Sequence, residues 1–431
     1  MNQYWDKEKE TLEREELLEY QKSQLVKTLE IASRSSFYSQ RIKKIPSQKN
    51  VLAFLKDLPF TAKQDVRDGY PFKFLAVPKE EVVRLHSSSG TSGNPTVVFY
   101  TAQDIEEWSD MVARCLYMVG VRKEDVFQNM MSYGLFTGGL GLHYGAEKIG
   151  CFIIPSGAGN TRRQVKLMQD FGTTVIHITP SYALYLAHYL ENELGIPPSS
   201  LNLRIALVGA EPHSESTDRK LEKIFGFRVF NSYGLSEMGG PGVGFECPAR
   251  KGIHIWEDHY FVEVIDPETE QPVKEGEDGE LVLTTLRREA MPLIRFRTGD
   301  LVTFLGTEPC PCGRTHVRVS RIHGRTDDLI IFKGVNILPS QIERVLMSFP
   351  EVGKNYQIVL EREEEGDKMI VRVEVEKIDD RYSSLSTLKE IIQKKLKEEI
   401  LVTPEVEFLQ PGSLPAFEGK GKRLIDRRKE V

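Results

Sequence analysis

The sequence predicts an α/β (α+β) fold, with a large N-terminal domain and a small C-terminal α/β domain. Its 431 residues exceed the roughly 250–300 at which a single core usually stops growing. Between residues 165 and 232, short β-rich runs alternate with helical ones, which is typical of a parallel-type sheet. Strands and turns then follow one another, which indicates a β-rich subdomain at about 245–320. We therefore expect domains at 1–325 and 326–431.

The N-terminal half begins with an expected amphipathic helix at residues 8–33, with Leu18, Leu25 and Leu29 on one stripe. The glycine-rich stretch at 134–145 indicates a close approach of the backbone to a neighbour. The alternating elements that follow are a strand at 174–179 ended by Pro180, a helix at about 182–194, a strand at 204–208, a helix at about 214–225 and a strand at 228–232. Ligands of a parallel sheet collect at the carboxyl ends of its strands, which here lead into the loops 209–213 and 233–237.

The C-terminal third shows two further patterns. Strands are expected at 261–265, 279–286 and 301–305. Ser340 with Glu343 three residues later predicts a capping box at the start of a helix. Residues 369–376 alternate strictly between apolar and polar side chains, which predicts a strand. The apolar faces of the two flanking helices are formed by Ile342, Val345, Leu346 and Phe349, and by Leu385, Leu388, Ile392 and Leu396.

Composition excludes several classes of protein. The net charge of −6 argues against a surface that binds nucleic acid over the whole molecule. The polar start at 1–15 has no apolar signal region, and no apolar run approaches the roughly 20 residues needed to cross a membrane. Five cysteines are too few for a disulfide scaffold in a chain of this length. We expect a cytoplasmic protein with no nucleic-acid or membrane partner.

Hydroxyl side chains and glycines crowd residues 87–93, and an apolar run at 97–100 follows. Glycines allow successive N–H groups to converge on an anion, and hydroxyls add donors, so the stretch suits a polyphosphate. It is not a P-loop, because no lysine follows the second glycine and a strand, not a helix, is expected next. An ordinary turn has the same composition, so this segment alone leaves both interpretations open.

Two motifs place an acidic residue where it can meet a ligand, one after a predicted strand and the other on an expected turn. Glu237 ends Tyr-Gly-Leu-Ser-Glu, and a carboxylate at such a strand end can hold Mg²⁺ together with substrate phosphates. Asp300 ends Arg-Thr-Gly-Asp, where a carboxylate on a turn can accept hydrogen bonds from ribose hydroxyls. The alternative for each motif is a surface turn, of the Asx type for Asp300.

Two basic segments are ambiguous in the same way. Residues 321–328 precede an apolar strand, and Lys333 and Gly334 follow it, which is also what a charged linker between domains looks like. The tail at 418–423, Glu-Gly-Lys-Gly-Lys-Arg, is typical of a solvated terminus. If mobile, it can bring an ammonium to a phosphate or carboxylate, where charge-assisted hydrogen bonds are strongest.

The order of these five segments resembles the adenylate-forming superfamily of acyl-CoA synthetases, adenylation domains and luciferases. The match is closer to the phenylacetate-CoA ligase branch and extends over about residues 60–428. It is carried by Ser88-Ser-Gly-Thr-Ser-Gly-Asn-Pro-Thr96, Tyr133-Gly-Leu-Phe-Thr-Gly-Gly139, His143-Tyr-Gly-Ala-Glu147, Gly334-Val-Asn-Ile337, Pro339-Ser-Gln-Ile-Glu343 and Glu418-Gly-Lys420. Thr96 stands where most of the superfamily has a lysine, which leaves open which cation meets the β- and γ-phosphates.

The resemblance implies roles for individual residues. Glu237 would bind Mg²⁺, Arg325 would contact ribose or phosphate, and Lys420, rather than Lys422, would reach the substrate carboxylate and α-phosphate. Asp327 would be the hinge of a mobile small domain. The residues implied in binding ATP, AMP or coenzyme A are Ser88, Ser89, Thr91, Ser92, Gly209, Ala210, Glu211, Asn231, Ser232, Tyr233, Gly234, Ser236, Asp300, Arg321, Arg325, Lys333 and Gly334.

An acyl pocket is expected around the glycine-rich stretch. Aromatic side chains with small glycines suit a flat aryl acid, and the same residues suit ordinary core packing equally well. The residues that would border the pocket are Tyr133, Phe136, Gly138, Gly139, His143 and Ala210.

A second metal site is expected in the β-rich subdomain. Cys247 and His254 precede a Cys-Pro-Cys-Gly turn that carries Cys310 and Cys312. Thiolates and imidazole are tetrahedral ligands of Zn²⁺, and some members of the branch resemble this pattern and carry zinc. We expect a structural zinc, with unrelated thiols as the alternative.

These implications predict an ATP-dependent ligase that activates an aromatic acid similar to phenylacetate as acyl-AMP and transfers it to coenzyme A. The alternative within the superfamily is an adenylyltransferase that uses a carrier protein, an amine or a deazaflavin as acceptor. A non-catalytic nucleotide sensor is disfavoured, because Glu237, Asp300, Arg325 and Lys420 are all present. The expected partners are a small carboxylic acid and coenzyme A, and the expected assembly is a homodimer.

Overall fold

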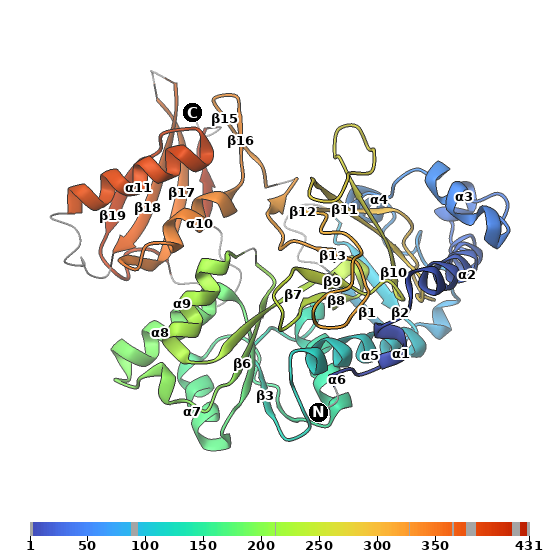
Figure 1. Ribbon diagram of the computed structural model, residues 1–431, viewed down its shortest axis with the longest axis horizontal. Coiled ribbons are helices and arrows are strands. Elements are labelled where there is room, and N and C mark those ends of the chain that lie inside the picture. The colour runs from blue at the N-terminus through green and yellow to red at the C-terminus, as the bar shows by residue number, and fades with distance from the viewer. Residues whose placement is uncertain are drawn as a thin grey trace. The chain divides into compact units, whose positions relative to one another are not determined.

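The computed structural model describes residues 3–87, 94–211, 213–326, 328–363, 366–375, 385–415 and 423–428 (Figure 1). The chain forms two compact units that interleave along the sequence. The first unit comprises Met1–Gly157, Thr174–His177 and Phe230–Arg321, and the second comprises Ala158–Thr173, Ile178–Val229 and Ile322–Val431. The domain boundary expected near residue 325 stays a prediction. No helix in the described ranges combines the length and the apolar character needed to cross a membrane.

The helices of the first unit are α1 (Lys7–Glu10), α2 (Arg14–Ala32), α3 (Val51–Asp57), α4 (Lys63–Asp68), α5 (Ala102–Met118) and α6 (Thr137–Ile149). The single helix expected at 8–33 is wrong, since α1 ends before α2 begins. Thr11 ends α1 with a non-helical φ of −129°, and the buried carboxylate of Glu10 turns back toward the start of α1, where it accepts the N–H groups of Trp5 and Asp6 at 2.8 Å each. The stripe on α2 is buried as expected at Leu25 and Leu29.

A parallel sheet lies in the first unit. Strand β3 (Val126–Asn129) pairs in parallel with β4 (Phe152–Ile154) and with β5 (Val175–Ile178), which confirms the parallel-type sheet. Helices α5 and α6 lie side by side beside it (Figure 1). Glycines allow this close packing: a Cβ at Gly145 would lie 2.4 Å from Val112 Cγ1, and one at Gly141 would lie 2.4 Å from the Trp108 ring. The neighbour approached by the glycine-rich stretch is therefore α5.

Antiparallel strands make up the rest of the first unit. They are the hairpin β1 (Arg84–Ser87) with β2 (Val97–Tyr100), the series β7 (Arg228–Leu235), β8 (Gly240–Glu246), β9 (Ile253–Ile255) and β13 (Arg318–Val319), and the meander β10 (Tyr260–Ile265), β11 (Asp278–Thr285) and β12 (Phe296–Thr303). Asp300 was expected on a turn, and this is wrong. It lies inside β12, where alternate residues are buried, so Thr298 and Asp300 both face inward.

The first part of the second unit contains α7 (Thr161–Phe171), β6 (Ile205–Gly209), α8 (Pro180–His188) and α9 (Glu215–Phe225). Pro180 ends the expected strand and occupies the first turn of α8, where its missing N–H costs nothing. Thr179 caps the same helix by accepting the N–H of Tyr182 at 3.3 Å.

The C-terminal part of the second unit is a sheet covered by α10 (Pro339–Met347) and α11 (Leu385–Ile400) (Figure 1). Its strands run in the order β19 (Glu405–Leu409), β18 (Gly366–Val375), β17 (Val352–Glu363) and β20 (Leu424–Asp426). Buried side chains of both helices and of the sheet form one core, among them Leu346, Leu388 and Val371. In chain order it is preceded by the short strand β14 (Gly324–Arg325) and then by the hairpin of β15 (Ile330–Phe332) with β16 (Val335–Ile337).

The capping box expected at Ser340 and Glu343 is wrong. Helix α10 begins at Pro339, and Gln341 closes its first turn by accepting the N–H of Leu338 at 2.9 Å. Ser340 instead donates to the His323 carbonyl, and Glu343 accepts from Thr217 Oγ1 at 2.8 Å. The proline, already favoured at a first helical position, sets the helix start two residues earlier than a serine N-cap at 340 indicates.

Candidate active site and Cys/His cluster

The Tyr-Gly-Leu-Ser-Glu motif joins β7 to β8 in the first unit, and its tyrosine reaches the acid of the Arg-Thr-Gly-Asp motif. Tyr233 donates from its hydroxyl to Asp300 Oδ2 at 2.6 Å, and both residues are buried. The N–H of Asp300 is held in turn by Thr298 Oγ1 at 3.0 Å. Two motifs that are distant in sequence therefore meet through a charge-assisted hydrogen bond, which fixes the orientation of the carboxylate.

Glu237, in the turn between β7 and β8, is buried with only 4% of its surface exposed. Its Oε1 receives no hydrogen bond from the described residues and lies 3.3 Å from the ammonium of Lys63. A buried carboxylate is costly unless a cation accompanies it. The site therefore holds an acid whose oxygen faces a cation and is otherwise available, which suits a Mg²⁺ ligand.

Thr61 anchors the backbone just before Lys63 to strand β12. The Thr61 N–H donates to the Arg295 carbonyl and the Thr61 carbonyl accepts from Arg297, each at 2.9 Å. Its hydroxyl lies 2.9 Å from that of Tyr38 and donates to the Ile294 carbonyl at 2.8 Å. Lys63, the first residue of α4, therefore follows a backbone segment that is fixed to β12, the strand that also carries Asp300.

The expected acyl-pocket residues line a chain of polar groups around Asn129. Asn129 Nδ2 donates to the Gly139 carbonyl at 2.6 Å and to the Tyr133 hydroxyl at 3.1 Å, and that hydroxyl lies 3.2 Å from His143 Nδ1. On its other side, Asn129 Oδ1 lies 3.1 Å from Nδ1 of His177, whose pKa is lowered to about 3 by burial. Burial also raises the pKa of Tyr133 to about 12. His177 and Tyr133 are thus both neutral at ordinary pH.

Both interpretations of the glycine-rich stretch find support. Core packing explains Gly139, where a Cβ would lie 2.6 Å from the Ser132 carbonyl oxygen. Gly138 has room instead, since a Cβ there would lie 3.7 Å from Met131 Cε, an ordinary contact distance, and Phe136 is 43% exposed. Thr137 Oγ1 lies 3.5 Å from Ser236 Oγ, so the start of α6 adjoins the Glu237 turn. A pocket at this place stays a prediction.

Four predicted metal ligands converge in the first unit. The ligand atoms of Cys247, His254, Cys310 and Cys312 all lie within 4.8 Å of one another, with Cys247 Sγ and Cys310 Sγ 3.7 Å apart and Cys312 Sγ 3.5 Å from His254 Nε2. A disulfide would need sulfurs about 2.05 Å apart. Four ligands placed about 2.3 Å from a tetrahedral Zn²⁺ lie roughly 3.8 Å apart, which is the spacing found.

Electrostatics in this cluster follow from its crowded thiols. Burial alone would lower the pKa of His254, but hydrogen bonds with Cys310 and Cys312 outweigh it and raise that pKa. Hydrogen bonds from Cys247 and Cys310 hold the pKa of Cys312 below its usual range. Cys310 and Cys312 therefore favour thiolate, which is the form that binds metals, whereas hydrogen bonds with these two thiols raise the pKa of Cys247. His254 Nδ1 departs from the usual pattern of metal-binding histidines, since it is buried with no hydrogen-bond partner among the described residues.

The N-terminal residues pack on the Cys-Pro-Cys-Gly turn. Arg314 donates from Nε to Glu10 Oε2 at 2.7 Å and from Nη2 to the Gln3 carbonyl at 2.8 Å. Tyr4 donates to the Cys312 carbonyl at 3.3 Å. The position of α1 therefore depends on the shape of this turn.

Further expected residues lie elsewhere. In the second unit, Ala210 follows β6 with φ of +67°, and Glu211 accepts from the Ser181 hydroxyl at 3.0 Å. Lys333 and Gly334 form the exposed turn of the β15–β16 hairpin with φ of +49° and +78°, as a type I′ turn requires. In the first unit, Arg321 donates to both oxygens of buried Glu246, at 2.9 and 2.8 Å. The remaining expected residues that the structure describes are Gly209 and Arg325 in the second unit and Asn231, Ser232 and Gly234 in the first.

Six expected residues lie outside the described part of the chain, and their roles stay predictions. They are Ser88, Ser89, Thr91 and Ser92 of the phosphate loop, the hinge residue Asp327 and the catalytic Lys420.

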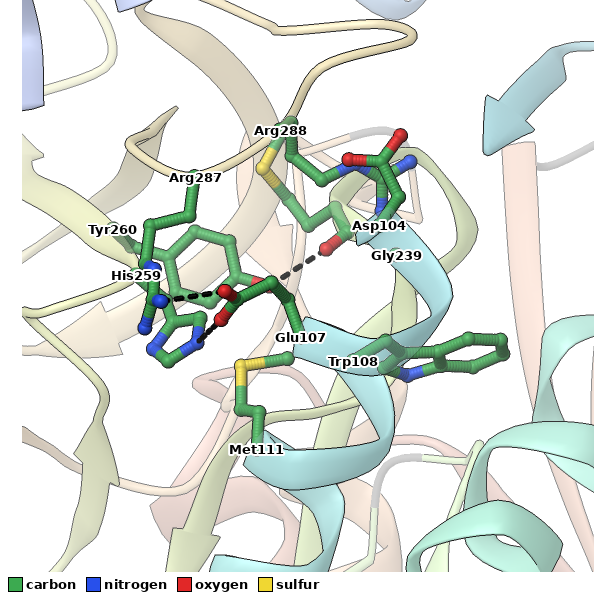
Figure 2. A pocket seen from close by; sticks show the side chains of 10 residues that line it. Asp104, Glu107, Trp108, Met111, Gly239, His259, Tyr260, Arg287 and Arg288 are labelled. Atoms are coloured by element: carbon green, nitrogen blue, oxygen red, sulfur yellow. Dashed lines mark hydrogen bonds and ion pairs between the residues drawn. The ribbon is translucent and has the colours of Figure 1, made fainter. Parts of the chain in front are cut away.

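Sequence reasoning missed a charged cavity beside Gly239 (Figure 2). Glu107 on α5 faces Arg287 and lies 3.4 Å from His259 Nε2. Burial would raise the pKa of Glu107, but its hydrogen bond with His259 and the charges of His259 and Arg287 lower it. In the sequence, this cavity is indicated only by two acids on one helical face, Asp104 and Glu107. That spacing does not identify His259 and Arg287 as the partners of Glu107.

Family models match both parts of the chain. Residues 12–286 match the AMP-binding enzyme family, and residues 334–428 match the AMP-binding enzyme C-terminal domain. The chain belongs to the AMP-binding enzymes, the adenylate-forming superfamily that the motifs indicated.

Curated relatives refine this assignment. A phenylacetate-coenzyme A ligase of Thermus thermophilus is 46% identical over 98% of this chain and 99% of its own length. A phenylacetate-coenzyme A ligase of Escherichia coli is 42% identical over 90% of this chain and 88% of its own. Within the superfamily, the chain falls in the phenylacetate-CoA ligase branch.

Solved structures agree with the expected fold class. A 2-hydroxyisobutyryl-CoA ligase in the postadenylation state, in complex with 2-HIB-AMP, is 26% identical with a TM-score of 0.90 over 100% of this chain and 93% of that chain. The same ligase in complex with 2-HIB-AMP and CoA in the thioesterification state is 27% identical with a TM-score of 0.72 over 99% of this chain and 93% of that chain.

Proposed function

We propose that this protein is an AMP-forming acid:CoA ligase that activates an aromatic carboxylic acid similar to phenylacetate. The observation that carries the proposal is the pair of buried carboxylates in the first unit, Asp300 held by Tyr233 and Glu237 facing Lys63. One acid is oriented to accept hydrogen bonds and the other is available to a cation, as binding of a metal–nucleotide complex requires. The phenylacetate-coenzyme A ligases that resemble the chain over nearly their whole length support the substrate class.

In the first half-reaction, the substrate carboxylate attacks the α-phosphorus of ATP and displaces pyrophosphate. Two anions must approach each other, so positioning and cations supply most of the catalysis. Asp300 would hold the ribose hydroxyls, and Lys420 would bring its ammonium to the carboxylate and α-phosphate. Mg²⁺, when bound at Glu237, would neutralise phosphate charge, and the otherwise unbonded Oε1 of that residue fits such a ligand.

In the second half-reaction, the thiol of coenzyme A attacks the acyl carbonyl and AMP leaves. The exposed Lys333–Gly334 turn would line the path of the pantetheine arm, with Asp327 as the hinge that presents it. The ammonium of Lys333 is exposed and offers a charge to the phosphates of coenzyme A.

The Cys/His cluster would hold a structural zinc. Its four ligand atoms match tetrahedral spacing and all come from protein side chains, so the site has no open position for a substrate. The zinc would stabilise the fold and take no part in the reaction.

The test is a panel of aryl and alkyl acids, each incubated with ATP, Mg²⁺ and coenzyme A. We expect AMP, pyrophosphate and a thioester, with phenylacetate-like acids turned over fastest. Exchange of pyrophosphate into ATP without any thioester would select an adenylyltransferase with another acceptor, and the absence of both reactions would select a nucleotide sensor.

A variant tests the two-step mechanism. Lys420→Ala should abolish adenylation and spare thioester formation from supplied acyl-AMP, and equal loss of both steps would contradict it.

The homodimer and the cytoplasmic location also remain predictions, and light scattering of the purified protein tests the homodimer.

A further inference from the structure

The phosphate loop of this chain lacks the cation that is usual in the superfamily. Thr96 stands where most of the superfamily has the phosphate-loop lysine, and this threonine is completely buried. A triphosphate carries its highest charge at the β- and γ-phosphates, where ammonium or guanidinium groups are the usual protein partners. Some other residue of this chain must supply that charge if ATP is its substrate.

Lys63 is placed to do so. Its ammonium lies 3.3 Å from Glu237 Oε1, the oxygen expected to face Mg²⁺, and 36% of the side chain is exposed. No other Lys, Arg or His among the described residues forms an ion pair with Glu237. Its four-carbon stem allows the ammonium to move from the carboxylate to a phosphate oxygen a few ångströms away.

The backbone below Lys63 is fixed, so the side chain alone must move. Thr61 is hydrogen-bonded through its N–H, carbonyl and hydroxyl to strand β12 and to Tyr38. Ala62 is held by Asp65, which accepts its N–H at 2.8 Å. A lysine on such a base loses side-chain freedom but no backbone freedom when it binds a ligand.

Arg288 is the strongest competing cation, and its contacts commit it elsewhere. It donates to the Phe99 carbonyl at 3.1 Å, lies over the Tyr100 ring at 4.3 Å from the centroid and approaches Asp104 at 3.9 Å. Only 10% of its side chain is exposed. Moving this guanidinium would break three contacts, whereas moving the Lys63 ammonium breaks one ion pair.

We propose that Lys63 binds the β- and γ-phosphates of ATP in place of the lysine that Thr96 replaces, and that Glu237 holds it at the site until the nucleotide arrives. This inference rests on the proposed function, because it requires ATP as substrate. It assigns Lys63 to the first half-reaction only, since AMP and the acyl-adenylate have no β- or γ-phosphate.

The test compares Lys63→Met with Lys63→Arg and with the control Lys56→Met, an exposed lysine on α3. Calorimetric titration of the intact protein measures the affinities for ATP with Mg²⁺, for pyrophosphate and for AMP. Lys63→Met should weaken ATP and pyrophosphate about 10- to 100-fold, the usual worth of a hydrogen bond to a charged group, and leave AMP unchanged. Lys63→Arg should recover part of the loss, and Lys56→Met should match the wild type.

Two further readouts separate a phosphate contact from a structural role. Thioester formation from supplied acyl-AMP and coenzyme A should be unchanged in Lys63→Met, as should the unfolding midpoint to within a few degrees. Equal weakening of AMP and ATP, or unaltered ATP binding, would overturn the inference. Should Lys63→Met fail to fold, Lys63→Gln retains a donor for Glu237 and gives the same comparison.

The wild type separates the two proposals. If it forms thioester and Lys63→Met binds ATP normally, the ligase stands and the role of Lys63 fails. If it binds ATP through Lys63 yet forms no thioester with any acid, the role of Lys63 stands and the ligase fails. A wild type that does not bind ATP overturns both.

Discussion

The Cys/His cluster and the Glu237–Lys63 pair belong to the same unit, and both gather polar groups from segments far apart in the sequence. They differ in how completely those groups satisfy one another. The cluster brings four ligand atoms within 4.8 Å of one another, which is a complete tetrahedral set. Among the described residues, the buried Oε1 of Glu237 faces only a half-exposed lysine. The first arrangement suits permanent binding and stability, and the second suits a charge that is exchanged during turnover.

The largest expected effect concerns the closed cluster. Cys310→Ser removes one of four ligands, so the protein should lose its bound zinc and about 3 kcal/mol or more of unfolding free energy, because structural zinc contributes directly to folding. Metal analysis and denaturant unfolding measure the two quantities, and a chelator should shift the wild type in the same direction. Cys151→Ser, outside the cluster, should change neither; a Cys310→Ser protein with normal zinc content and stability would show the cluster to be unrelated thiols.

The next effect concerns Glu237 and is expected in the activity of the protein, not in its stability. Glu237→Gln should lower the adenylation rate about 100- to 1000-fold, as does removal of a group that stabilises charge in a transition state. Zinc content and the unfolding midpoint should stay near those of the wild type, because the amide keeps the shape of the side chain. Exchange of labelled pyrophosphate into ATP is the measurement, with Glu30→Gln on the surface of α2 as control. Full activity of Glu237→Gln would remove this carboxylate from the site.

A smaller loss of stability and of ATP binding is expected when the hydrogen bond from Tyr233 to Asp300 is removed. Tyr233→Phe removes the 2.6 Å bond to Asp300 and leaves a buried carboxylate with one partner fewer. We expect a loss of about 1–3 kcal/mol in unfolding free energy and a raised KM for ATP. Tyr182→Phe, which removes a bond between two neutral hydroxyls, is the matched control and should leave the KM unchanged. An unaltered KM in Tyr233→Phe would separate Asp300 from the nucleotide.

The smallest effect at neutral pH concerns His177, behind the expected acyl pocket. Its pKa of about 3 in the folded protein lies below the ordinary value of 6.5, so the unfolded chain takes up a proton first as the pH falls. Stability from this residue is complete above about pH 6.5 and is lost toward pH 3, at no more than about 1.4 kcal/mol per pH unit. His177→Gln should flatten the dependence of unfolding free energy on pH over that range, and an equally steep dependence would show that other groups cause it.

Much of the site was predictable because the motifs name residue types that the chemistry needs. Local patterns indicate Glu237, Asp300 and the four expected zinc ligands, and the structure places those four residues together. The errors concern local context. Asp300 was assigned to a turn because Thr-Gly-Asp is typical of one, whereas pairing of β12 with β11 holds it in a strand. Ser340 with Glu343 is typical of a helix start, whereas Pro339 occupies the first position of α10 and leaves Ser340 inside the first turn.

The sequence by itself indicated the family, through the resemblance of its ordered motifs, and the parallel strands and the residues able to carry charge, which depend on periodicity and composition along short segments. Only the tertiary structure decided the partners. Lys63 has no motif around it and reaches Glu237 only because Thr61 pairs with β12. Glu107 likewise finds His259 and Arg287 only once α5 packs beside them (Figure 2). Ion pairs between distant segments depend on three-dimensional packing, which no local pattern contains.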